Sequence, residues 1–283
     1  MEFYKYHGTG NDFIMLNGMV EGPCLTSVEI ADICNHHTGI GADGIIFACA
    51  PAGGADAAMR VFNADGSEAE MCGNGIRCLA KFLYERLDLR KKDMLIETGA
   101  GAKAVSLTLS GSSVIGAEVD MGLPELAAED LPAPDDPSRP GEVTISMKAG
   151  DELRAFCVSM GNPHCVLFVT DAAEAPVTRL GPVLERHPLF PGRTNVEFAQ
   201  IVDAHNVVLR VWERGVGETQ ACGTGACAAV AAAINSGKCE SPVQVQLPGG
   251  TLNIRLDGGG HLLMSGPAVE IFCGELSEGW RMT

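Results

Sequence analysis

The chain lacks long apolar runs and a recognisable targeting segment. Its most apolar stretch, residues 221–234, is short and interrupted by glycine, whereas a membrane-spanning helix needs about 20 apolar residues. The first residues, MEFYKYHGTGNDF, contain no basic region followed by an apolar one, as a signal peptide would. We therefore expect a cytoplasmic protein that does not interact with a membrane.

Basic residues are also scarce. The 283 residues include 20 Lys and Arg against 36 Asp and Glu, so the formal net charge is −16. A nucleic-acid partner is not expected, because a phosphate backbone requires a basic face. Only seven lysines occur, and none lies in a glycine-rich context that suggests a Schiff base, so pyridoxal phosphate is not indicated. An anionic substrate would have to be held by local groups against this global field.

The eleven cysteines form no C-x-x-C pair and no Cys/His cluster with zinc-finger spacing. Their number is odd, and the chain has no secretion signal, so a disulfide framework is not expected. We expect free thiols and no metal site. Most of the cysteines would be small buried residues of the core.

The apolar pattern predicts an α+β protein. Helices are expected at Gly75–Leu87, Gly225–Asn235 and Ser27–Asn35, the last with Ser27 as its N-cap. Short β-branched runs bounded by Gly, Pro, Asn or Asp predict strands. These runs are Phe13–Leu16, Gly44–Phe47, Val61–Phe62, Met94–Ile96, Val105–Leu109, Val143–Met147, Val166–Val169, Val207–Trp212 and Val243–Leu247. The acidic, proline-rich segment Gly122–Gly141 predicts a loop with a domain boundary nearby.

One short motif occurs twice. The tetrapeptides CGNG and CGTG begin at Cys72 and Cys222, 150 residues apart, and a glutamate precedes each cysteine by four residues. Asn11 and Asn162 each follow a glycine at nearly the same separation. This common register predicts two similar halves, the second starting near Glu118, each with a helix entered through Cys-Gly-x-Gly.

The motif suits acid–base chemistry. A helix N-terminus stabilises a thiolate, and the amides after the cysteine can bind a carboxylate; those amides belong to Gly73, Asn74, Gly223 and Thr224. If the two thiols face each other, one can remove an α-proton while the other returns a proton to the opposite face. Such a site would have to exclude water.

Other interpretations of the motif remain. A cysteine at a helix start can simply pack in the core. Cys72 could be the nucleophile of a redox or hydrolytic enzyme, although that leaves the second thiol unexplained. A non-catalytic amino-acid-binding protein would need the amides but not both thiols. The cysteines without such a context are expected to be core or incidental: Cys24, Cys34, Cys49, Cys78, Cys157, Cys165, Cys227, Cys239 and Cys273.

Five segments together resemble the diaminopimelate epimerases, cofactor-independent enzymes of lysine and peptidoglycan precursor biosynthesis. They are HGTGNDF, NADGSEAEMCGNGIRC, GNPH, RTNVEF and ERGVGETQACGTGACA. The resemblance runs in order from Phe3 to about Phe272 and so covers nearly the whole chain.

The resemblance implies a fold and an activity. Each of two similar domains would be a curved mixed sheet around a central helix, with the active site in the interdomain cleft. The domains would comprise residues 1–117 plus 267–283 and residues 118–266. The enzyme would be an isomerase, a homodimer without cofactor, that interconverts L,L- and meso-diaminopimelate by a two-thiol mechanism.

The resemblance also implies residue roles. Cys72 and Cys222 would be the acid–base thiols, and Glu213 and His164 would orient the reacting ammonium group and tune the thiols. The residues that would bind the reacting carboxylate of the substrate are Gly73, Asn74, Gly223 and Thr224. The residues that would hold the remainder of the substrate are Asn11, Asn63, Asn162, Asn195 and Arg214, the last four at its distal carboxylate. Gly44 stands where some family members have glutamine and is left out. A proline-racemase-like enzyme is the nearest rival, but its substrate has no distal charged head for Arg214 to bind.

Overall fold

The computed structural model describes residues 1–147, 150–277 and 279–280. They form two compact units, Met1–Asp120 with Ser265–Thr283 as unit 1 and Met121–Met264 as unit 2. The domain boundaries expected after residues 117 and 266 are close to these but not identical. Within the expected return segment 267–283, residues 278 and 281–283 lie outside the described part of the chain.

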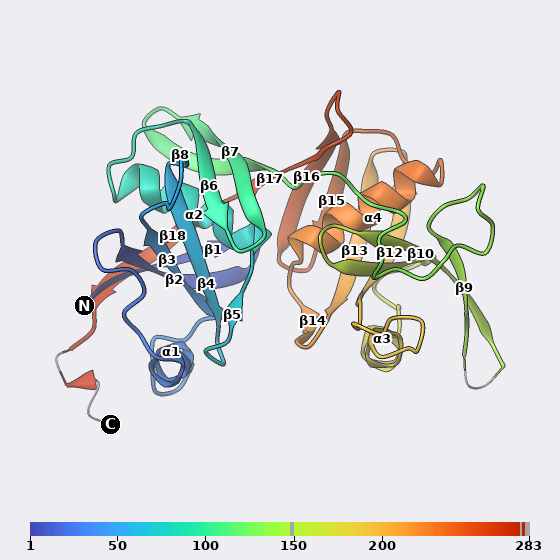
Figure 1. Cartoon of the computed structure of the whole chain (residues 1–283), viewed down its shortest axis with the longest axis horizontal. Helices are drawn as coiled ribbons and strands as arrows, with labels where there is room; N and C mark the ends of the chain where they lie inside the picture. The colour runs from blue at the N-terminus through green and yellow to red at the C-terminus, as the bar shows by residue number, and fades with distance from the viewer. Residues whose placement is uncertain (148–149, 278, 281–283) are drawn as a thin grey trace. The chain divides into compact units, whose positions relative to one another are not determined.

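Within the described residues, each unit combines strands with two helices; Figure 1 shows their arrangement. Unit 1 contains β1 (Glu2–Gly8), β2 (Asn11–Gly18), α1 (Ser27–Cys34), β3 (Gly44–Cys49), β4 (Ala57–Asn63), β5 (Glu68–Ala69), α2 (Gly73–Glu85), β6 (Asp93–Thr98), β7 (Gly101–Ser110), β8 (Ser113–Asp120) and β18 (Val269–Glu275). Unit 2 contains β9 (Glu142–Ser146), β10 (Glu152–Ser159), β11 (Pro163–Phe168), α3 (Val177–Glu185), β12 (Asn195–Asp203), β13 (Asn206–Glu213), β14 (Gly217–Thr219), α4 (Gly223–Asn235), β15 (Val243–Leu247) and β16 (Gly250–Leu256). The second boundary between the units, after Met264, falls within β17 (Leu262–Pro267).

The two units repeat one topology. In unit 1, β2 pairs antiparallel with β1 and parallel with β3, β3 pairs antiparallel with β4, and β4 pairs parallel with β6. In unit 2, β11 pairs antiparallel with β10 and parallel with β12, β12 pairs antiparallel with β13, and β13 pairs parallel with β15. The order of directions is the same in both units. The predicted pair of similar α+β domains is confirmed.

A helix lies at the centre of each unit, inside a mixed sheet. Helix α2 contacts β1, β2, β3, β4, β7 and β8, and α4 contacts β10, β11, β12, β13, β15 and β16. Helices α1 and α3 cover the outer side, where α1 contacts β3 and α3 contacts β12, β13 and β14. A strand such as β3, GIIFAC, is therefore buried on both faces, which explains its continuous apolar run.

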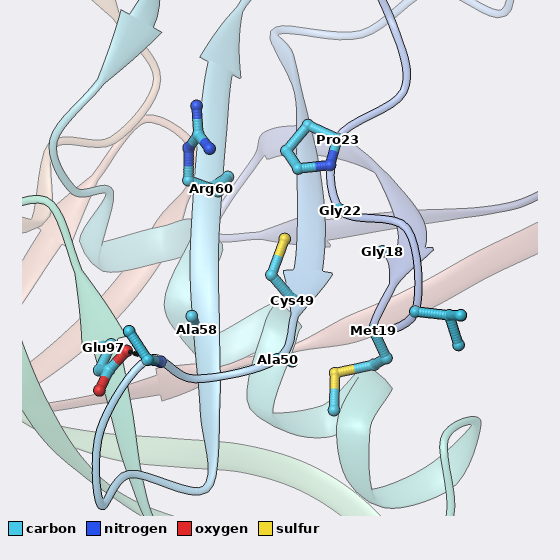
Figure 2. A pocket seen from close by; sticks show the side chains of 11 residues that line it. Gly18, Met19, Gly22, Pro23, Cys49, Ala50, Ala58, Arg60 and Glu97 are labelled. Atoms are coloured by element: carbon cyan, nitrogen blue, oxygen red, sulfur yellow. Dashed lines mark hydrogen bonds between the residues drawn. The ribbon is translucent and has the colours of Figure 1, made fainter.

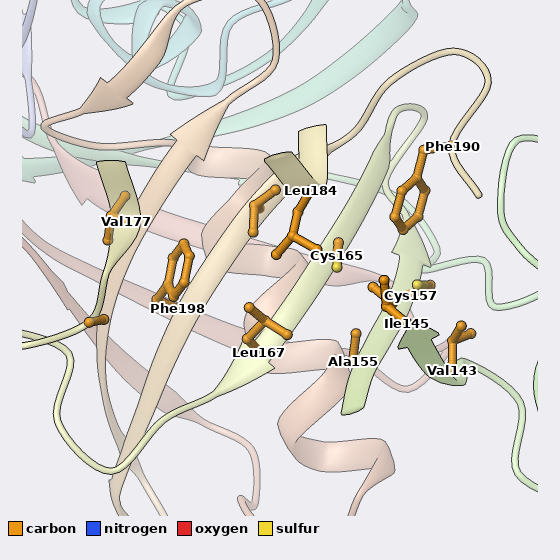
Figure 3. Packing of buried hydrophobic residues seen from close by; sticks show 12 residues of the cluster. Val143, Ile145, Ala155, Cys157, Cys165, Leu167, Val177, Leu184, Phe190 and Phe198 are labelled. Atoms are coloured by element: carbon orange, nitrogen blue, oxygen red, sulfur yellow. The ribbon is translucent and has the colours of Figure 1, made fainter. Parts of the chain in front are cut away.

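The outer layer of unit 2 has its own apolar core (Figure 3). Val196 and Phe198 of β12 pack there with Leu167 of β11 and with Val177 and Leu184 of α3. Side chains alternate along a strand, so Asn195 and Glu197 of β12 lie on the opposite face, toward α4. This alternation places polar residues beside the central helix.

Most predicted elements are present, with a few differences. The cap of α1 is Thr26 rather than Ser27: the Thr26 hydroxyl accepts from the N–H of Glu29, and the Glu29 carboxylate accepts from the N–H of Thr26. Helix α3 is absent from the sequence prediction because Pro182 lies inside it and Pro176, its N-cap, makes no side-chain cap bond. The predicted loop at 122–141 is irregular apart from one bridge, Glu125 with Ser159. Among the described residues, no helix has both the length and the apolar character needed to cross a bilayer.

The core of unit 2 makes a stability prediction. Phe198→Ala removes a fully buried ring and should lower the free energy of unfolding by about 3–5 kcal/mol, as measured by urea denaturation. Val202→Ala, at a half-exposed position of the same strand, is the matched control and should cost less than about 0.5 kcal/mol. Equal effects of the two substitutions would contradict the packing described here.

Candidate active site

In unit 1, Cys72 is the N-cap of the central helix α2. Its backbone is extended, with φ −138° and ψ 116°, and its Sγ accepts a hydrogen bond from the N–H of Gly75 at 3.4 Å. The usual N-cap acceptor is a side-chain oxygen; here a sulfur takes that place. A Cβ at Gly75 would lie 2.5 Å from Cδ1 of Ile46 and 3.4 Å from Cβ of Cys72. A larger residue at the fourth position of the motif would therefore require the Ile46 side chain to move.

Asn11 faces the Cys72 thiol from the start of β2. Its Oδ1 lies 3.7 Å from Sγ of Cys72 and accepts from Nδ2 of Asn74 at 3.4 Å. Its own Nδ2 donates to Oδ2 of Asp43 at 2.8 Å. Asp43 thus fixes which end of the Asn11 amide faces the thiol. The structure brings Asn11, Cys72 and Asn74 together.

Arg77 supports the CGNG turn from inside α2. It is fully buried, and Nη1 donates to the carbonyl oxygen of Gly73 at 2.9 Å. Nη2 donates to Oδ1 of Asn74 at 3.1 Å and to Oγ1 of Thr9 at 2.8 Å. A cation therefore lies against the motif in an otherwise acidic chain.

Asn63 and Gly44 pair with each other across β4 and β3. Asn63 is exposed, and its amide donates to Oγ of Ser67 at 3.0 Å in the turn after β4. A Cβ at Gly44 would lie 2.4 Å from the carbonyl oxygen of Phe62. No side chain fits at Gly44 without movement of the backbone.

In unit 2, Cys222 caps α4 by the same construction. Its φ is −119° and its ψ is 114°, and Sγ accepts from the N–H of Gly225 at 3.4 Å. Oγ1 of Thr224 lies 3.5 Å from the same sulfur. A Cβ at Gly225 would lie 3.3 Å from Sγ of Cys222 and 2.9 Å from Oε1 of Glu197. Both motifs thus enter a helix through a cysteine cap, as expected from the sequence.

A chain of polar contacts lies beside this cap. Nε2 of His164 is 3.0 Å from Oδ1 of Asn162, and Nδ1 of His164 is 2.7 Å from Oε1 of Glu197. His164 and Glu197 are both fully buried, whereas Asn162 is half-buried. His164 and Asn162 are among the site residues predicted from the sequence, whereas Glu197 is not.

The turn between β13 and β14 holds Glu213 and Arg214. The backbone N–H of Arg214 donates to Oδ1 of Asn195 at 2.9 Å, and Glu213 accepts a hydrogen bond from the hydroxyl of Thr219. Glu185 accepts from the N–H of Gly215 at 3.1 Å. The Arg214 side chain is exposed, and Nη1 makes a hydrogen bond of 3.2 Å to the carbonyl oxygen of Gly192. The backbone of the turn is fixed, while the guanidinium group is accessible to a ligand.

The surroundings of Cys222 favour its protonated form. Burial, followed by the carboxylate of Glu213, raises the pKa of the Cys222 thiol well above its ordinary value; Glu197 acts in the same direction, and the Thr224 hydroxyl and the Gly225 amide oppose them. Burial is the main cause that raises the pKa of Cys78, inside α2, to about 12, while Arg77 and Lys81 act in the opposite direction. A thiol like Cys78 stays protonated at neutral pH and cannot serve as a base.

A surface hollow in unit 1 lies away from these residues. It is lined by residues of β2, β3, β4, β6 and adjoining loops, among them Cys49, Arg60 and Glu97 (Figure 2). Arg60 is paired with Glu68, and Glu97 accepts from the N–H groups of Ala52 and Gly53. Its charged groups already have partners, so we assign it no ligand.

Three residues near the thiols were missed by the sequence interpretation: Asp43, Arg77 and Glu197. Arg77 lies five residues after Cys72 on the same helix, a spacing visible in the sequence. Asp43 and Glu197 are in strands or loops remote in sequence from the cysteines, and only the sheet pairing brings them close.

The chain matches a family model described as "Diaminopimelate epimerase" over residues 3–127 and 156–271. A diaminopimelate epimerase of Synechococcus elongatus is 46% identical over 278 residues, covering 98% of each chain. A diaminopimelate epimerase of Moorella thermoacetica is 48% identical over 277 residues, covering 97% of this chain and 99% of the relative.

Solved structures with the same fold are more distant in sequence. A hydroxyproline epimerase from Agrobacterium vitis superposes with a TM-score of 0.73 at 14% identity, covering 97% of this chain and 91% of that one. At this identity the likeness concerns the fold alone.

The environment of Cys222 predicts slow, pH-shifted alkylation. Because iodoacetamide reacts with the thiolate, a raised pKa moves the midpoint of the reaction to higher pH. We expect the midpoint for Cys222 to lie above about 8.5, the ordinary thiol value, as measured by peptide mass spectrometry of substrate-free protein. The exposed Cys24 serves as the reagent control. A midpoint for Cys222 below 7 would contradict the environment described.

The contact at Gly44 predicts a stability loss. Gly44→Gln places a Cβ against the Phe62 carbonyl and should lower the free energy of unfolding by about 1–3 kcal/mol. Gly54→Gln is the matched control, because a Cβ at Gly54 meets nothing within 4 Å. Thermal or urea denaturation of both variants checks this; equal stability of the two would refute it.

Proposed function

The chain belongs to the diaminopimelate epimerase family, and we propose that it interconverts L,L- and meso-diaminopimelate by a two-thiol mechanism. The observation that carries this proposal is that Cys72 and Cys222 cap the central helices of two similar units in the same way. Each unit thus supplies one thiol and one set of helix N-terminal amides. The two-thiol mechanism requires one substrate molecule to reach both thiols.

The half-sites would divide the substrate between them. The amides of Gly73, Asn74, Gly223 and Thr224 would bind the carboxylate at the reacting centre, where helix N-termini stabilise negative charge. Asn11 would hold the substrate beside Cys72. Asn63, Asn162, Asn195 and Arg214 would bind the distal head, with Arg214 as a forked donor to its carboxylate.

The reaction transfers one proton at each face of the α-carbon. A thiolate takes the α-proton, and the electron pair left on carbon is delocalised into the carboxylate that the amides stabilise. The opposite thiol then gives its proton to the other face and becomes the thiolate. The stereocentre is inverted, and the two sulfurs have exchanged roles.

The resting state follows from the surroundings of the thiols. The raised pKa of Cys222 suits it to hold the proton that is donated. Glu213 would orient the substrate ammonium group, and Glu213 and His164 would influence the thiols; both ring nitrogens of the buried His164 already have partners. All these groups belong to the chain itself, and the proposal requires no cofactor.

The proposal extends to assembly and location. As the resemblance implies, we propose a cytoplasmic homodimer; analytical ultracentrifugation measures the dimer directly.

The exposed guanidinium of Arg214 favours a substrate with a second charged head over a proline-like one.

The central test uses L,L-diaminopimelate and reduced protein in D2O without added pyridoxal phosphate or metal. We expect the meso isomer to form with one deuterium at the inverted carbon, as read by mass spectrometry and chiral chromatography. Cys72→Ser and Cys222→Ser should each lower turnover by at least about a hundredfold, because each removes a required acid–base group.

Cys24→Ser, at an exposed cysteine outside both half-sites, is the matched control and should keep wild-type turnover. Wild-type turnover in either active-site serine variant would rule out the two-thiol mechanism. Absence of deuterium incorporation by folded, reduced wild-type protein would rule out the substrate.

A further inference from the structure

A buried pair of ionisable groups lies beneath the first turn of α4. His164 on β11 and Glu197 on the neighbouring parallel strand β12 are both 0% exposed, and Nδ1 of His164 lies 2.7 Å from Oε1 of Glu197. The position of a Cβ at Gly225 is in contact distance of both Oε1 of Glu197 and Sγ of Cys222. The carboxyl group is therefore next to the catalytic motif, yet the mechanism above assigns it no role.

The number of protons on this pair follows from its burial. An ionised carboxylate beside a neutral imidazole would leave a net negative charge in the interior, which is costly. Oε2 of Glu197 has no hydrogen-bond partner among the described residues, so nothing there compensates such a charge. Loss of hydration also raises the pKa of Glu197. The pair is therefore neutral overall and shares a proton between Oε1 and Nδ1.

The shared proton determines the state of the other ring nitrogen. If the proton is on Nδ1, the ring is an imidazolium, and Nε2 carries a hydrogen. If the proton is on Oε1, the ring is neutral with Nδ1 as acceptor, and Nε2 again carries the hydrogen. In both cases Nε2 of His164 donates to Oδ1 of Asn162 at 3.0 Å. The Asn162 carbonyl is thus engaged, and its NH₂ group is the end left for a ligand.

We propose that Glu197 is a positioning residue that, through His164, holds the half-buried Asn162 amide with its NH₂ group toward a substrate carboxylate. The proposal rests on the function given above, in which Asn162 binds the distal head. A reversed amide would present its oxygen to that carboxylate, and two acceptors repel. Glu197 in this way favours a carboxylate at the distal position without touching it.

Two substitutions separate positioning from packing. Glu197→Leu removes the partner at similar volume, so His164 no longer has to carry its hydrogen on Nε2. Glu197→Gln keeps the shape, and its amide can donate to Nδ1, which leaves the hydrogen on Nε2. We expect Glu197→Leu to raise KM for diaminopimelate by about tenfold, the value of one hydrogen bond to a charged group, with a smaller change in kcat. Glu197→Gln should leave KM within about threefold of the wild-type value.

A substrate-free measurement keeps the proposal independent of activity. In ¹⁵N NMR of histidine-labelled protein, Nε2 of His164 should give the signal of a protonated nitrogen throughout pH 6–9, with His164→Gln used to assign it. Glu185→Gln, at another buried carboxylate of unit 2, is the control and should leave that signal unchanged. Glu197→Leu should change the ¹⁵N signal of His164 Nε2.

The outcomes distinguish this proposal from the function on which it rests. An unprotonated Nε2 in the wild type overturns the positioning role even if diaminopimelate is epimerised. A folded Glu197→Leu variant with wild-type KM overturns it as well. A protonated Nε2 in a protein that does not turn over diaminopimelate supports the hydrogen-bond chain and contradicts the proposed substrate.

Discussion

The sulfur cap of each central helix is the constraint on which the rest of the fold depends. Each cap combines an extended cysteine with a glycine three residues later, where a Cβ would lie within 3.0 Å of a packed side chain, Ile46 in unit 1 and Glu197 in unit 2. The helix behind the cap is enclosed by strands and cannot shift to relieve a poor fit. A group that is chemically reactive is thus also structurally fixed. This rigidity suits a proton transfer, for which a small misplacement is costly.

The same motif has acquired different neighbours in the two units. In unit 1, the buried guanidinium of Arg77, itself a residue of α2, holds the turn after Cys72. Beneath α4, a neutral His164–Glu197 pair occupies the space, and Cys222 has Glu213 nearby. Two thiols of equal surroundings would tend to share one protonation state, but inversion needs one thiol and one thiolate. The repeated topology gives the two cysteines the same backbone setting, and these different buried groups give the two thiols different surroundings.

The sequence predicted what depends on local patterns and missed what depends on pairing. The Cys-Gly-x-Gly helices and the apolar strands were predictable because their signals are contiguous. Strands β1 and β10 carry charged residues without a sustained apolar run, and α3 contains Pro182, so their local signals were weak. Glu197 lies in β12, where no strand was predicted, and both faces of this strand are covered at Glu197. Its role beside Cys222 arises only when β11 and β12 pair in register.

The pairing of β1 with β18 has a consequence for biosynthesis. Residues Glu2–His7 of the first strand form their outer ladder with residues Val269–Glu275 of the last. A ribosome releases the last strand only after the whole of unit 2 has been made. Unit 2, which is one continuous stretch of chain, can therefore complete its fold first. The N-terminal unit keeps an open sheet edge until β18 has been synthesised, and that edge is where a nascent chain would need protection from aggregation.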